Sequence, residues 1–291
     1  MKNIFYICLA LGFMFSSVAF VSCGSDDDNG GASGGGAGGF TPGKFMGPKR
    51  VFADNLLSSY GLEKSYRYVL TYNSDDFVSK VTRESLNSSG QVTYSKDYEV
   101  SYQGNQVIVT IRTSTSDRYY TYTFTIGNNG FAESWTTDDY AGSNTISYVK
   151  CDYDSDEHLT KLTVYEDGKD KPKTWVGYLA WQGGNLVELS DWDSSKSNYT
   201  YSSKGNVAGL FFYPSMGGDM SDFYEEVFHY IGLLGKGSSN LVESYSRKST
   251  SGTINWTLDA AGRPSKCFSQ ETSDSGKGTN ISTKNYFWNY R

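Results

Sequence analysis

The chain has 291 residues, with 26 Lys and Arg against 32 Asp and Glu, two His, and a formal charge of −6. Its composition is 37% apolar and 16% aromatic, enough for a large core, which excludes intrinsic disorder for most of the chain. Because the charge is negative and Lys and Arg are not clustered, a nucleic-acid partner is also excluded.

The N-terminal segment predicts secretion. An apolar run over 4–20 follows the single charge of Lys2 and has the length of a signal peptide, which is short for a spanning helix. The run ends in Phe20-Val21-Ser22-Cys23, which resembles the lipobox of bacterial lipoproteins, where cleavage leaves an acylated cysteine. We therefore predict a signal peptide over 1–22 and lipidation of Cys23; an ordinary secretory signal is the alternative.

The residues after Cys23 predict a location at the cell surface. Ser25, Asp26, Asp27 and Asp28 resemble the acidic export signal that directs lipoproteins of the Bacteroidetes to the outer face of the outer membrane. The Gly- and Asp-rich composition of 23–43 is typical of a flexible tether. We expect 44–291 to form a single β-rich domain that contacts the membrane through the N-terminal lipid.

Residues from about 44 onward alternate as β-strands do. Tyr66, Tyr68, Leu70 and Tyr72 share one face, and over 120–126 aromatic residues alternate with threonines. A period of two with one apolar and one polar face is typical of antiparallel sheet.

One kind of turn recurs along this region. An aromatic residue ends a strand, a short Asp, Asn or Gly turn follows, and an apolar residue begins the next strand. The aromatic residues are Tyr72, Tyr102, Phe124, Tyr153, Trp181, Tyr201 and Trp256. Their spacing predicts an all-β fold, an antiparallel meander of hairpins that forms a curved sheet or a barrel-like structure.

A single helical pattern interrupts the strands. Phe223, Val227, Ile231 and Leu234 fall on one face at helical spacing, which predicts a helix near 219–235. We expect this helix to lie on the sheet or to plug its mouth, with a polar outer face that carries His229.

Two of these patterns carry a resemblance to known families. The sequence Tyr-Asp-Ser-Asp-Glu-His-Leu-Thr-Lys-Leu-Thr at 153–163, its echoes at 72 and 258, and Gly-Leu-Leu-Gly-Lys at 232–236 resemble a family of Bacteroidales surface lipoproteins. That family is classified as a domain of unknown function and is described as having a porin-like fold. The resemblance therefore implies a porin-like fold and the location of a surface lipoprotein, but it implies no activity. The turns are also similar to tyrosine-aspartate repeats, with Glu157 where those repeats have Gly.

Catalytic motifs are missing from the sequence. It contains no nucleophile elbow, zinc-protease motif, P-loop or dinucleotide fingerprint, so we expect neither an enzyme nor a cofactor. His158 falls in a predicted turn, and we expect both it and His229 to be solvated. Asp138 with Asp139, and Asp191 with Asp193, could serve as the carboxylate pair of a glycoside hydrolase, although exposed turns explain them equally well.

Two further patterns leave alternatives open. Asp152, Asp154 and Asp156 have the alternate spacing of a calcium loop, but its Gly and final Glu are replaced, so a solvated turn is the preferred interpretation. With Cys8 removed and Cys23 lipidated, Cys151 and Cys267 remain. They form a disulfide or, as we expect, stay as buried thiols.

Aromatic residues beside acids give the functional hypothesis. Sugar rings stack on Trp and Tyr while carboxylates bind their hydroxyls, so Asp191-Trp192-Asp193, and Trp135 with Asp138 and Asp139, are candidate glycan platforms. Aromatic residues also favour strands for packing reasons alone. Three classes of function therefore remain: a surface binding or adhesion module, a structural or accessory envelope protein, and a carboxylate-dependent hydrolase.

Overall fold

The computed structural model of the chain describes residues 57–114, 116–139, 147–166, 173–190, 195–213, 226–274 and 278–291. The predicted signal peptide, Cys23, the export signal and the tether lie outside these residues. Among the described residues, the secondary structure is almost entirely strand, as the alternation predicts.

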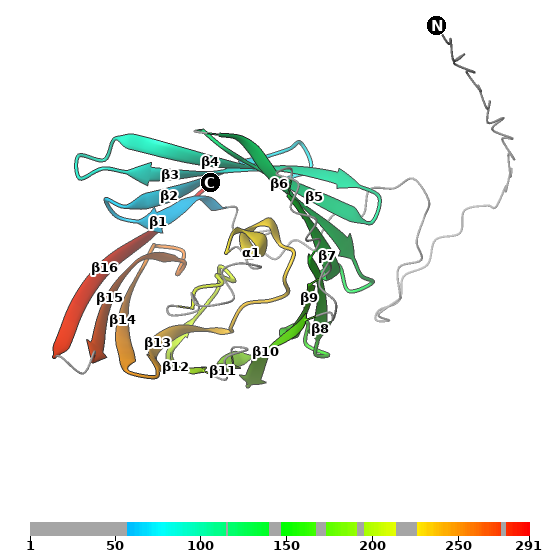
Figure 1. Cartoon of the computed structure of the whole chain (residues 1–291). Coiled ribbons are helices and arrows are strands. Elements are labelled where there is room, and N and C mark those ends of the chain that lie inside the picture. The colour runs from blue at the N-terminus through cyan, green and yellow to red at the C-terminus, as the bar shows by residue number, and fades with distance from the viewer. Residues whose placement is uncertain are drawn as a thin grey trace, which may run out of the picture. The chain divides into compact units, whose positions relative to one another are not determined.

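Sixteen antiparallel strands form a closed barrel in which each strand pairs with its neighbours in sequence (Figure 1). The strands are β1 Leu57–Leu62, β2 Tyr66–Tyr72, β3 Val78–Leu86, β4 Val92–Gln103, β5 Gln106–Thr113, β6 Ser116–Ile126, β7 Ala132–Asp139, β8 Ser147–Tyr153, β9 Leu159–Glu166, β10 Lys173–Gln182, β11 Asn185–Ser190, β12 Lys196–Gly205, β13 Asn240–Arg247, β14 Thr250–Leu258, β15 Pro264–Asp274 and β16 Thr279–Tyr290. The ring closes where β1 pairs with β16, from Leu57 opposite Tyr290 to Leu62 opposite Tyr286. The all-β prediction is therefore confirmed, and its barrel alternative is the correct one.

The alternating residues of each strand separate into an inner and an outer face. Tyr68 and Leu70 on β2, and Val107, Val109 and Ile111 on β5, all lie buried inside the barrel. The residues between them point outward. The half of the inner face nearest the turns that begin at Asn73 and Asp259 thus forms the hydrophobic core, whereas Arg83 and Glu271 lie inside the other half.

The recurring turn has a local physical cause. Asp154 accepts hydrogen bonds from the backbone N–H of Asp156 and His158 at 3.0 and 2.8 Å, and Asn73 and Asp259 cap their own turns in the same way. The fourth residue of each turn has a positive φ, which is 72° at Glu157 and 77° at Gly262. The turn therefore requires an Asp or Asn first and favours Gly fourth.

The aromatic residues before these turns connect neighbouring hairpins. Seven aromatic residues at or near the ends of even-numbered strands each donate a side-chain hydrogen bond to a backbone carbonyl near the start of the preceding strand, at 2.6 to 2.8 Å. The donors are Tyr72, Tyr102, Tyr153, Trp181, Tyr201, Trp256 and Tyr290, to Leu57, Val78, Ala132, Leu159, Leu186, Val242 and Pro264 respectively. Phe124, near the end of β6, has no hydrogen-bond donor in its side chain. These bonds run around the end of the barrel where the even-numbered strands finish, which we call the turn rim.

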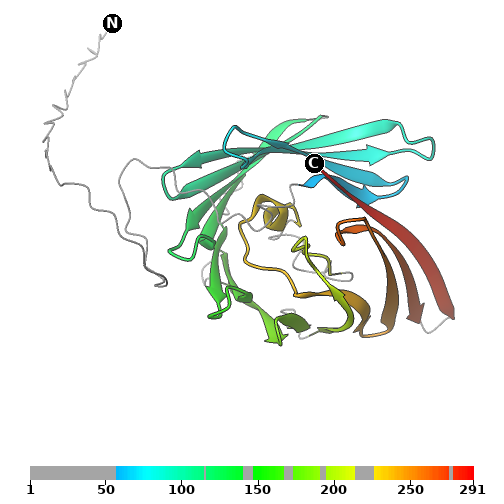
Figure 2. The same ribbon diagram turned by 180° about the vertical axis from the view of Figure 1, so that it is seen from behind.

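The long connection between β12 and β13 folds back into the barrel from the turn rim. Its described parts, 206–213 and 226–239, are called the plug, and helix α1 Val227–Ile231 lies inside the ring of strands in both views (Figures 1 and 2). This helix ends before the predicted limit of 235, because Gly232 with φ 91° stops it after Ile231. The part of the prediction over 219–225 lies outside the described residues.

Candidate functional site

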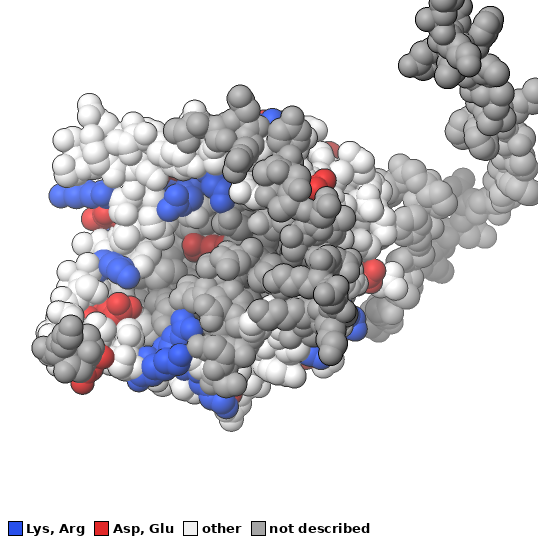
Figure 3. Space-filling view, in the orientation of Figure 1, with Lys and Arg blue, Asp and Glu red and all other residues white. Residues whose placement is uncertain are grey.

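Ion-paired charged side chains lie on the outer face of the barrel, beside exposed apolar ones such as Tyr178 and Phe268. Ion pairs join neighbouring strands there, for example Lys80 to Asp97 at 2.9 Å and Lys196 to Glu188 at 2.7 Å. Arg67 pairs with Glu84 in the same manner. On the barrel end in Figure 3, Lys and Arg are interspersed with Asp and Glu among the described residues. The ion pairs on the outer face differ from the outward face of a membrane-spanning barrel, which is an apolar band.

Aromatic packing fills the interior around α1. Phe228 contacts the rings of Tyr122, Phe124 and Trp135, with centroids 5.0, 4.9 and 6.3 Å apart. Tyr230 lies 4.0 Å from Tyr60 on the opposite side. The helix is therefore part of the hydrophobic core, and here the interior differs from the polar interior of a water-filled channel.

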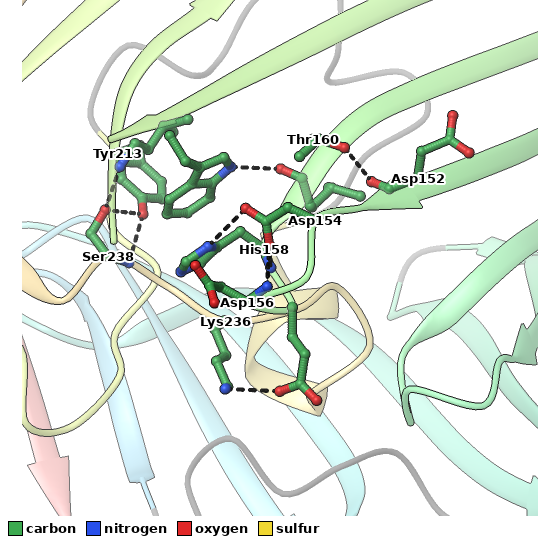
Figure 4. Close-up of polar contacts among 12 residues, drawn as sticks. Asp152, Asp154, Asp156, His158, Thr160, Tyr213, Lys236 and Ser238 are labelled. Atoms are coloured by element: carbon green, nitrogen blue, oxygen red, sulfur yellow. Dashed lines mark hydrogen bonds and ion pairs between the residues drawn. The ribbon is translucent and has the colours of Figure 1, made fainter. Parts of the chain in front are cut away.

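Polar contacts attach the plug to the turn rim. The backbone N–H of Lys236 donates to the carbonyl of Glu157, and the Lys236 ammonium lies 2.8 Å from the Glu157 carboxylate (Figure 4). Ser238 Oγ accepts from the Leu186 N–H at 3.0 Å and lies 2.8 Å from the Tyr213 hydroxyl. The plug is thus held by its own backbone as well as by packing.

Both histidines lie in the interior, which contradicts the prediction that they are solvated. His158 is 6% exposed, stacks on Trp181 and has Nδ1 3.1 Å from Asp154 (Figure 4). His229 is 2% exposed and stacks on Phe211, and burial lowers its pKa well below the usual value. The turn position of His158 and the helical spacing around His229 do not show that the closed barrel surrounds and buries both side chains.

The two described cysteines are free and buried, as expected. Burial raises the pKa of Cys267 to about 12 and that of Cys151 further, so neither thiol is a nucleophile at neutral pH. The calcium interpretation also finds no support, because Asp154 caps the turn and Asp152 lies beside Lys150 at 3.2 Å. In the described part of the chain, no group of three or more His, Cys, Asp or Glu side chains could hold a metal.

The predicted glycan platforms are not assembled where the structure describes them. Trp135 is 1% exposed on the inner face, whereas Asp138 is exposed on the outer face of the same strand. The two side chains therefore do not share a surface. Asp139 ends β7, and its side chain is not among those described. Asp191, Trp192 and Asp193 lie outside the described residues.

A groove on the outer face is the candidate site that the sequence did not reveal. It lies over β12, β13, β14 and β15, and its volume is about 550 Å³. Apart from Tyr245 and Gly252, its lining consists of Ser, Thr, Asn and Gln side chains, including Asn198, Thr200, Ser244, Ser251, Thr253 and Gln270. We call it the outer groove. In the sequence these residues are only the polar face of ordinary strands, so no local signal marks them.

The floor of the outer groove depends on one glycine. Tyr245 points inward, where its hydroxyl donates to Glu271 at 2.7 Å, and its ring crosses the inner side of Gly252. A Cβ on Gly252 would come within 2.4 Å of that ring. Gly252 therefore lets the ring pack directly against β14 beneath the groove. Above it, the hydroxyls of Thr200 and Ser244 lie 2.7 Å apart. The uncharged side chains of the outer groove can therefore donate hydrogen bonds to a ligand and accept hydrogen bonds from it.

None of the helices in the described residues is long and apolar enough to cross a membrane.

Comparisons with known proteins identify the fold. No family model matches the sequence, and no curated protein is similar to it. Among solved structures, the chain is similar to a porin-like protein from Bacteroides uniformis, with a TM-score of 0.63 and 17% identity over 81% of this chain and 96% of the other. A porin-like protein from Bacteroides vulgatus aligns with a TM-score of 0.46 and 14% identity, over 82% and 99% respectively. The porin-like fold implied by the family resemblance is thus confirmed for this chain.

Proposed function

We propose that the protein is a lipid-anchored protein of the outer membrane whose barrel stands in water at the cell surface and serves as a binding module. The observation that carries this proposal is the charged outer face. A Lys or Arg that faces lipid at the bilayer midplane costs about 2–4 kcal/mol, and the outer face carries several such residues on neighbouring strands. Aromatic packing around α1 fills the interior, which supports a binding function over transport of solutes through the barrel.

The membrane attachment in this proposal is the lipid on Cys23, followed by the tether. The sequence around Cys23 and the acids Asp26, Asp27 and Asp28 support this part. A structural or accessory envelope protein would share the anchor and the barrel but would bind no ligand. The proposal includes no catalytic step.

The test is palmitate labelling of the full-length protein in a bacterium that processes lipoproteins. We expect Cys23→Ala to lose the label and to leave the membrane fraction, because the thioether needs the cysteine sulfur. Cys8→Ala changes the same leader at a position that cleavage removes, so it should keep both label and membrane attachment. A Cys23→Ala protein that has lost its leader and still resists extraction with alkaline carbonate would show that the barrel itself is embedded, and would overturn the proposal.

A second measurement tests the surface location. Replacing Asp26, Asp27 and Asp28 by Ala should leave the palmitate label unchanged and reduce cleavage by a protease added to intact cells. Equal cleavage of the variant and the wild type would contradict the export signal.

A further inference from the structure

The outer groove differs in charge from the rest of the outer face. Ion pairs join β2 to β3, β3 to β4 and β11 to β12, yet no charged side chain lines the groove. An anionic ligand would meet no cation there. Hydroxyl and carboxamide groups both donate and accept hydrogen bonds, which matches a ligand that carries many neutral hydroxyls.

The strands give the groove a fixed shape. Asn198 and Thr200 lie on β12, Ser244 on β13 and Thr253 on β14, and direct register places Thr200 opposite Ser244 and Ser244 opposite Thr253. Gln270 continues the same row on β15, opposite Thr253. Polar groups on paired strands are held in place before a ligand arrives, so less freedom is lost on binding.

An exposed aromatic ring lies on the same outer face. Tyr178 on β10 is 54% exposed. Tyr178 pairs with Ser190 on β11, and Glu188 on β11 pairs with Asn198 at the edge of the groove. Two strand spacings, about 10 Å, and an offset of two residues, about 7 Å along the strand, thus separate the ring from the edge of the groove. The ion pair of Lys196 with Glu188 lies between them. A ring at this position offers a flat apolar face on which a sugar can stack.

We propose that the outer groove binds a neutral oligosaccharide, whose hydroxyls exchange hydrogen bonds with the Ser, Thr, Asn and Gln side chains while one end of the chain stacks on Tyr178. This inference rests on the proposed function, because it requires that the outer face stand in water. It assigns the ligand class and the binding surface.

The test is native gel electrophoresis of residues 24–291 and its variants in gels that contain soluble glycogen, mannan or xylan, with polygalacturonate as the anionic comparison. We expect at least one neutral polysaccharide to retard the wild type. Thr253→Arg, which fills the groove from an exposed position, should weaken the apparent affinity by about tenfold or more. Tyr178→Ala should weaken it as well.

The matched control is Thr257→Arg, on the same strand and the same outer face but outside the groove. It should bind as the wild type does, and all variants should melt at similar temperatures because the changed side chains are exposed. Wild-type binding by Thr253→Arg, retardation by polygalacturonate alone, or no retardation at all would overturn the groove assignment. Wild-type affinity of Tyr178→Ala would overturn the stacking role. None of these outcomes alters the palmitate and extraction results, so failure of the groove is distinguishable from failure of the anchored barrel.

Discussion

Single residues in this barrel are set by backbone conformation and burial. The same turn position holds Glu157 in the middle of the chain and Gly262 nearer its C-terminus, with almost the same positive φ. Only Gly adopts this region without a steric cost. The turn geometry therefore explains a weak sequence repeat whose strictest residue is sometimes replaced.

Gly262→Ala tests this cost. No heavy atom lies within 4 Å of the Cβ it would add, so the change acts through φ alone. We expect a loss of about 1–2 kcal/mol in the free energy of unfolding by urea. Gly205→Ala, which has no positive φ and would meet Val207 at an ordinary 3.7 Å, should change stability much less. Equal effects of the two variants would contradict the argument.

His229 predicts a pH dependence of stability. Its folded pKa is lowered by burial, so the unfolded chain binds a proton below pH 6.5 that the folded chain does not. The stability from neutral His229 is therefore present above pH 6.5 and falls as the pH drops toward the folded pKa. Between pH 7 and pH 5 the unfolded pKa alone limits this loss to at most about 2 kcal/mol.

Urea titrations of the wild type and His229→Phe at both pH values provide the measurement. The variant retains every carboxylate, so the difference between the two pH dependences isolates the imidazole. The same pH dependence in both proteins would show that His229 contributes nothing to it.

At the scale of elements, hydrogen bonds along the turn rim hold one hairpin to the next. Tyr72 donates to Leu57 at 2.6 Å, and burial raises its pKa to about 12, which keeps the donor proton in place at neutral pH. The pattern explains why aromatic residues with a donor recur at strand ends. Packing alone would accept Phe at each of these positions.

Tyr72→Phe should therefore lower the free energy of unfolding by about 0.5–1.5 kcal/mol, the contribution of one hydrogen bond. Tyr178→Phe removes a hydroxyl from an exposed ring on the outer face and should change stability little. Chemical denaturation of both variants compares the two sites directly. A loss of equal size at Tyr178 would mean that the rim bond is not the cause.

Local signals in the sequence account for most of the strands and turns but not for their closure. The alternation along β2 predicts that Tyr68 and Leu70 share one buried face, whichever element packs against that face. Pairing of Leu57 with Tyr290 depends on registers summed around the whole ring, which no short pattern contains. The outer groove could not be predicted for a similar reason, because Thr253 and Gln270 become neighbours only through strand pairing.

At the scale of the whole molecule, the barrel has the strand order of a pore but carries ion pairs on its outer face. Its inner face is apolar around α1, and its outer face carries ion pairs between strands. Fold similarity to a porin-like protein thus describes the path of the chain. The similarity does not by itself show whether water or lipid surrounds the barrel.

Planar lipid bilayers test this difference. The protein without its lipid, added at micromolar concentration, should produce no conductance steps, since membrane insertion would bury charged side chains in lipid. A conducting outer-membrane porin, added to the same bilayer, serves as the positive control. Reproducible single-channel steps from this protein would overturn the interpretation of its outer face.

The pairing of β1 with β16 also orders the events of folding. The ring cannot close until Leu57 meets Tyr290, residues separated by nearly the whole described chain, and contacts of such long sequence separation form slowly. During synthesis, β1 therefore waits for the last strand with one edge unpaired. A chain cut short before β16 would therefore leave β1 and β15 with one unpaired edge each.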